Sequence, residues 1–141
     1  MTDFDEILER FEAVDEEIAE LEAQMSSGAE LPLEPTLERS MGIVRGMLNA
    51  FGRHRGQEMP DTQDLLETFK VFVKGEPSLN AVRDNVRELV FYRNCVDMDR
   101  RDALPAKPER MAVRTARHIY LYLRTRLITE SRQGAKPLKP M

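Results

Sequence analysis

Apolar side chains recur at intervals of three and four residues through most of the chain, which is the spacing of amphipathic α-helices. Short stretches rich in glycine and proline interrupt this pattern, and helices end at such stretches. The sequence therefore predicts an all-α bundle of about five helices, over residues 3–25, 36–53, 62–74, 79–100 and 109–130. We expect residues 1–132 to form a single helical domain and residues 133–141 to form a flexible C-terminal tail.

The first predicted helix has the most regular pattern. Its apolar positions alternate steps of three and four residues over three heptads, as in coiled coils: Phe4, Ile7, Phe11, Val14, Ile18, Leu21 and Met25. The flanking positions are acidic, so two parallel copies of this helix would repel each other. We interpret the seam as a self-association surface that takes an antiparallel copy or a basic helix, and we expect a homodimer.

The second predicted helix carries a separate stripe of small residues, Gly42, Gly46 and Ala50, spaced four residues apart. A glycine inside a helix costs roughly 1 kcal/mol relative to alanine, so the two glycines need a reason. We interpret the stripe as a site where another helix packs closely. A ligand crevice is the alternative interpretation.

Charge is distributed unevenly along the chain. Residues 1–30 carry eleven acidic side chains and one basic, whereas residues 100–141 carry three acidic and eleven basic, although the whole chain has a net charge of only −4. We expect the acidic first helix to meet the basic last helix, in the same chain or in a neighbouring one. Domains that bind nucleic acid are normally basic throughout, and this chain is not.

The last predicted helix has one face that mixes arginine with large aliphatic residues: Arg110, Arg114, Arg117, Leu121, Arg124 and Ile128. This mixture is typical of protein interfaces, where arginine is enriched. We therefore predict a non-enzymatic protein-interaction module with an adaptor, chaperone-like or regulatory role, whose protein partner the sequence does not name.

The alternative function is nucleic-acid binding, with the basic face on phosphates and the acidic helix as a competing decoy. Only this alternative predicts binding that weakens steeply with salt and strengthens when residues 1–28 are removed.

Residues that could carry catalysis are few. Arg93 falls on the apolar face of the fourth predicted helix with Asp97 one turn further on, and we predict a buried, structural ion pair. The carboxylates of Asp97, Asp99 and Asp102 are close in sequence, but the glycine and glutamate of an EF-hand loop are missing. We expect no metal, no cofactor and no catalysis.

The single cysteine, Cys95, excludes an internal disulfide and favours a reducing compartment, so we expect a cytoplasmic protein. Acidic residues follow Met1 directly, which is unlike a secretory signal. The longest apolar runs are far shorter than the roughly 18–20 residues of a membrane span, and we expect no contact with membranes.

Overall fold

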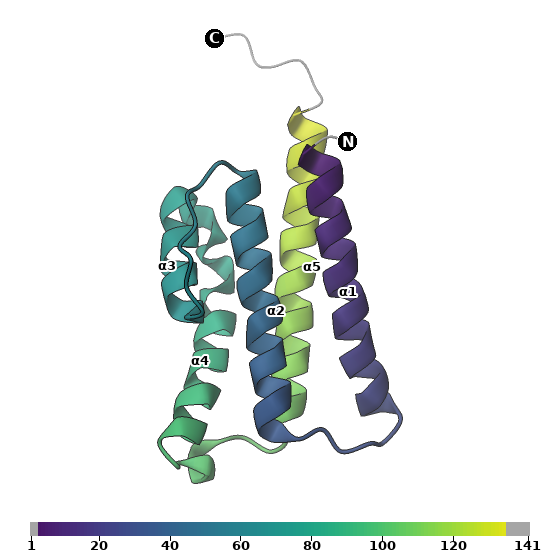
Figure 1. The fold of residues 1–141 in the computed structure, drawn as a ribbon, viewed down its shortest axis with the longest axis vertical. Coiled ribbons are helices and arrows are strands. Elements are labelled where there is room, and N and C mark those ends of the chain that lie inside the picture. The colour runs from purple at the N-terminus through teal and green to yellow at the C-terminus, as the bar shows by residue number, and fades with distance from the viewer. Residues whose placement is uncertain (1–2, 135–141) are drawn as a thin grey trace.

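The computed structural model describes residues 3–134 and confirms the all-α bundle (Figure 1). The α-helices of this part of the chain are α1 (Asp3–Ser26), α2 (Leu33–His54), α3 (Leu65–Gly75), α4 (Arg83–Asp97) and α5 (Pro108–Gly134). Two short 3-10 helices, η1 (Pro77–Val82) and η2 (Arg101–Ala103), flank α4, and no strand occurs between residues 3 and 134.

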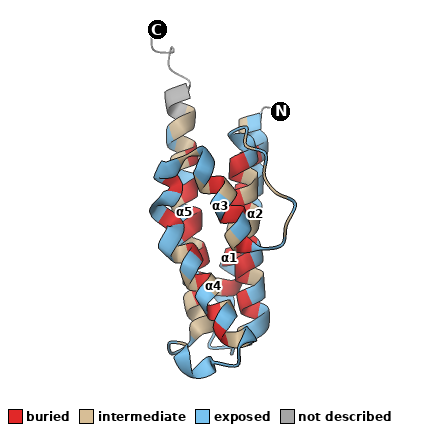
Figure 2. Cartoon of the chain, turned by 90° about the vertical axis from the view of Figure 1, so that its left-hand side faces the viewer, coloured by how far each residue is buried: buried red, intermediate tan, exposed pale blue. Residues whose placement is uncertain are grey.

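Helices α2 and α5 run side by side through the middle of the molecule (Figure 1). Helix α1 packs against both of them and runs in the opposite direction, while α3 and α4 pack on the other side of α2. Buried residues follow the inward faces of the helices (Figure 2). The side chains of Val44, Leu48 and Phe51 on α2 and of Ile119 and Leu123 on α5 are fully buried. Each such side chain contributes roughly 1.5–3 kcal/mol when it leaves water.

The prediction of one fourth helix over residues 79–100 is wrong, because the segment forms two elements. Pro77 begins the 3-10 helix η1, and the Glu76 carboxylate caps it by accepting a hydrogen bond from the Ser78 backbone N–H at 3.4 Å. At its other end α4 stops at Asp97, because Asp99 adopts a left-handed conformation with φ of 57°. The amide of Arg100 then donates a hydrogen bond to the Cys95 carbonyl at 2.7 Å and closes the helix.

Helix α5 extends beyond the predicted end at residue 130. Gln133 and Gly134 are helical, so they do not belong to the predicted tail. The remainder of that predicted tail, residues 135–141, lies outside the described residues.

The stripe of Gly42, Gly46 and Ala50 does not pack closely against another helix of the described chain, so the predicted close packing does not occur within residues 3–134. A Cβ atom added at Gly42 or Gly46 would meet no atom within 4 Å outside its own helix. The face of α2 that enters the core is the one with Val44 and Leu48. The glycines lie beside it, along an open groove between α1 and α2.

Replacing these glycines should therefore stabilise the protein. Because the added methyl group meets no neighbour, we expect Gly42→Ala and Gly46→Ala each to raise the free energy of unfolding by about 1 kcal/mol, the difference in helix propensity. Urea denaturation followed by circular dichroism measures this difference.

Gly52→Ala is the matched control, because Gly52 lies on the same helix but its added Cβ would collide with the Met59 side chain. We expect this variant to gain less stability or to lose some. A loss of stability in Gly42→Ala and Gly46→Ala would show that the glycines do admit a close neighbour in the folded chain.

Candidate functional site

The outer face of α5 contains the residues that the sequence assigns to an interaction surface. Arg114, Leu121 and Arg124 are exposed, whereas Arg110 and Ile128 are half-buried. The opposite face of the helix is fully buried against α2, and this burial fixes the rotation of α5 about its axis.

Arg117 differs from the other arginines of this face because it is paired inside the chain. Its guanidinium donates hydrogen bonds to Asp15 at 2.6 Å and to Glu22 at 2.8 and 3.0 Å, and both carboxylates belong to α1. It also lies 5.1 Å from the centre of the Tyr120 ring. Only 19% of the Arg117 side chain is exposed. The acidic helix and the basic helix therefore meet within one chain, at this residue.

The electrostatics of this contact follow from its geometry. The hydrogen bonds that Arg117 donates to Glu22, and then those that it donates to Asp15, raise the pKa of Arg117 above its ordinary value, although burial acts in the opposite direction. Burial also raises the pKa of the neighbouring Tyr120 hydroxyl. Arg117 thus stays protonated and holds α1 against α5. The carboxylates of Asp15 and Glu22 on α1 balance its positive charge.

The heptad seam of α1 faces the same interior. Ile7, Phe11, Ile18 and Leu21 are buried, and they belong to the core that α1 shares with α2 and α5. The three other seam positions, Phe4, Val14 and Met25, are partly buried against this core. In this structure the seam serves packing within the chain, and its use by a second copy stays a prediction.

The exposed strip of α5 that remains is cationic with one large apolar residue. Arg114, His118 and Arg124 are exposed, and Leu121 lies between them with 52% of its surface exposed. The sequence has no acidic residue from Arg110 to Thr129, so no carboxylate of α5 itself neutralises this strip.

Two further arginines are used to join elements at the C-terminal end of α5. Arg126 donates hydrogen bonds to Glu130 at 3.0 Å and to the Ser78 hydroxyl at 3.2 Å. Arg55, which follows α2, pairs with Glu76 at 3.0 Å and also with Glu130. These contacts are structural, since each guanidinium reaches more than one element.

The prediction of a buried ion pair between Arg93 and Asp97 is wrong in its burial. The pair exists, with the two groups 3.3 Å apart, and Arg93 also lies 3.2 Å from Glu38 on α2. The Arg93 side chain is 42% exposed, because Tyr92 and not Arg93 turns towards the core. The Tyr92 hydroxyl is satisfied there by Glu88 at 2.8 Å, and burial raises its pKa.

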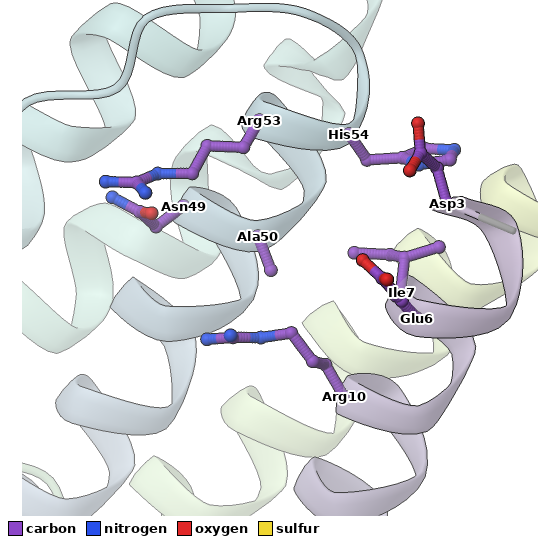
Figure 3. A pocket seen from close by; sticks show the side chains of 8 residues that line it. All are labelled: Asp3, Glu6, Ile7, Arg10, Asn49, Ala50, Arg53 and His54. Carbon is purple, nitrogen blue, oxygen red and sulfur yellow. The ribbon is translucent and has the colours of Figure 1, made fainter. Parts of the chain in front are cut away.

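A second group of polar residues, which the sequence did not lead us to predict, lines the groove between α1 and α2. Arg45, Asn49 and Arg53 are spaced four residues apart on α2, beside the small-residue stripe. Figure 3 shows Asn49 and Arg53 on α2 and Arg10 on α1, across the groove from them. The two parallel stripes on one helix are visible in the sequence and could have revealed this group. The contribution of Arg10 could not be foreseen, because it depends on how α1 docks.

Among the described residues no group of three or more histidine, cysteine or acidic side chains could hold a metal ion. The acidic residues after α4 do not gather, and Asp102 forms an ion pair with Arg100 at 3.0 Å. Cys95 is buried. No helix in the described part of the chain has the length and apolar character needed to cross a membrane.

The burial difference between two arginines gives a stability test. Arg117 and Arg93 each bridge two carboxylates, but Arg117 is the more buried. We expect Arg117→Met to lower the free energy of unfolding by about 1–2 kcal/mol, because it leaves two partly buried carboxylates without their cation. Arg93→Met, the control, should cost less than about 1 kcal/mol. Equal losses in urea denaturation would contradict the role assigned to Arg117.

Comparisons with known proteins give no relatives: no family model, no curated protein and no solved structure matches this chain. Its function must therefore be argued from the surfaces described above.

Proposed function

We propose that this protein is a non-enzymatic interaction module that binds an acidic protein partner through the outer face of α5. The observation that carries the proposal is the exposed Leu121 among Arg114, His118 and Arg124. An apolar side chain ringed by cations can be buried by a partner whose carboxylates pair with the guanidinium groups.

The fate of Arg117 supports a protein partner over a nucleic acid. A nucleic-acid surface uses its cations on phosphates, whereas the most central arginine of this face is already neutralised by Asp15 and Glu22. If the acidic helix α1 competed with nucleic acid for the basic face of α5, α1 would have to cover the other arginines of that face too. Arg114 and Arg124 are instead exposed, and neither forms an ion pair with a described residue.

Comparative affinity purification tests the proposal. We expect the double variant Leu121→Asp/Arg124→Glu to retain at least tenfold less of the main partner than the wild type does, because both the apolar contact and the charge are removed. Phe91→Asp/Arg87→Glu on α4 is the matched control, with the same change in charge and a similarly exposed apolar residue, Phe91 being 48% exposed. The control should retain the partner, and both variants should keep the wild-type circular dichroism spectrum.

A second arm addresses the nucleic-acid alternative. Removing α1 is unsuitable, because Phe11 and Ile18 would leave holes in the core. Asp15→Asn/Glu22→Gln instead releases Arg117 with little change in shape. Anisotropy with single-stranded RNA at two salt concentrations should show no binding by wild type or variant.

Two outcomes would refute the proposed function. One is salt-sensitive RNA binding that is tighter in the Asp15→Asn/Glu22→Gln variant than in the wild type. The other is an equal loss of the purified partner in the α4 and α5 variants.

A further inference from the structure

A groove between α1 and α2 has the properties of a second binding site. Its wider part is a cavity of about 530 Å³, with Ala13 and Val14 of α1 on one wall and Gly42 and Gly46 of α2 on the other. An adjoining cavity of about 320 Å³ continues it towards the end of α2 (Figure 3). The two cavities share Arg10 and Ala50, so they form one continuous groove.

The groove is open because small residues occur on both walls, namely Ala13 of α1 and Gly42, Gly46 and Ala50 of α2. The space beside Gly42 and Gly46 is empty to 4 Å from the position of an added Cβ atom. From Gly42 to Arg53 the α2 wall is about 16 Å long at 1.5 Å per residue, which is roughly three helical turns. The described chain therefore leaves a groove of this length open, lined by small apolar residues and by arginines.

Four arginines line this groove: Arg10 of α1 and Arg39, Arg45 and Arg53 of α2. Arg39 pairs with Glu20 at 2.8 Å. Arg45 forms no ion pair with a described residue and donates a hydrogen bond to the Thr62 carbonyl at 3.5 Å.

Arg10 and Arg53 form no ion pair with any described residue, although Asp3, Glu6 and Glu17 also lie along the groove. Arg10 is the one basic residue among the first thirty. The fold thus brings Arg10, the one cation of the acidic helix α1, into the same groove as the arginines of α2.

We propose that this groove binds an acidic, amphipathic helix of a partner protein. Small apolar side chains of that helix pack on Gly42, Gly46 and Ala50, where the missing side chains let two helices approach closely. Its carboxylates pair with Arg10, Arg45 and Arg53, which stand on both walls.

A nucleic acid fits this groove less well. Asp3, Glu6 and Glu17 line the groove, and they repel a phosphate backbone, which is charged at every nucleotide. A helix can avoid this repulsion because it can place its carboxylates opposite the arginines alone. The site is also separate from the α5 surface of the proposed function, since no residue of α5 lines either cavity.

Binding of a designed peptide tests the inference with the full chain. The probe is a fluorescein-labelled 21-residue helix of alanine, leucine and glutamate with its glutamates flanking an alanine face; the control probe has glutamine in their place. We expect the glutamate probe to bind at least fivefold more tightly than the glutamine probe by anisotropy. In ¹⁵N-edited NMR spectra the amide signals of Gly42 and Gly46 should shift, and that of Gly75 should not.

Two groove variants and one matched variant locate the site. Arg10→Gln/Arg53→Gln removes charge, and Gly46→Leu places a side chain in the groove at a position whose added Cβ atom meets no neighbour; each should weaken binding at least fivefold. Arg83→Gln/Arg87→Gln removes the same charge from exposed positions of α4, outside both candidate surfaces, and should leave binding unchanged.

Failure of the wild-type chain to bind the glutamate probe would overturn the inference, as would equal affinity in the groove variants or loss only in the α4 variant. Single-stranded RNA that shifts the same glycine signals more strongly than the peptide would assign the groove to nucleic acid instead. None of these outcomes depends on the proposed function of α5, because that function is tested with other variants.

Discussion

The packing of α2 against α5 is the constraint on which the rest of this structure depends. These two long helices bury complementary faces along most of their length, and every other α-helix packs on one or both of them. Because interiors are close-packed, the rotation of each helix about its axis is fixed by the side chains that it buries. The exposed strip of α5 and the groove face of α2 are thus what remains after the core has been formed.

Arginine serves three different purposes in this bundle, and burial distinguishes them. Arg117 and Arg126 are largely covered and hold helices together, and each of them contacts more than one other side chain. Arg93 is half exposed and bridges α4 to α2 at the surface. Arg10 and Arg114 lie on the two candidate surfaces, and neither forms an ion pair with a described residue. Net charge along the sequence could not separate these classes.

The sequence alone predicted the helices, because a period of 3.6 residues is a local property. It placed Arg93 wrongly because the inward face of α4 continues past Leu89 to Tyr92 and Cys95, which are buried. Arg93 therefore lies at the edge of the buried face, where it reaches Glu38 of α2. The side of α4 that enters the core depends on how this helix packs on α2, α3 and α5.

The glycine stripe shows a different limit of sequence reasoning. Close packing and an open groove both require small residues, and only the position of α1 decides between them. The pairing of acidic and basic helices was likewise predictable in outline, but the choice of Arg117 over its neighbours depends on how α1 is tilted against α5. Contacts between elements distant in sequence are set by docking geometry, which no single helix encodes.

The contact between Asp15 and Arg117 also has a consequence for synthesis of the chain. Its two residues are 102 positions apart, so α1 leaves the ribosome long before the helix that completes its environment. Helix α2 can cover one side of α1 early, yet the side that α5 covers stays in water until α5 has been synthesised. The high negative charge of α1 makes nascent chains repel each other during this interval. Asp15 and Glu22 thus contribute to this repulsion before α5 is made, and they pair with Arg117 afterwards.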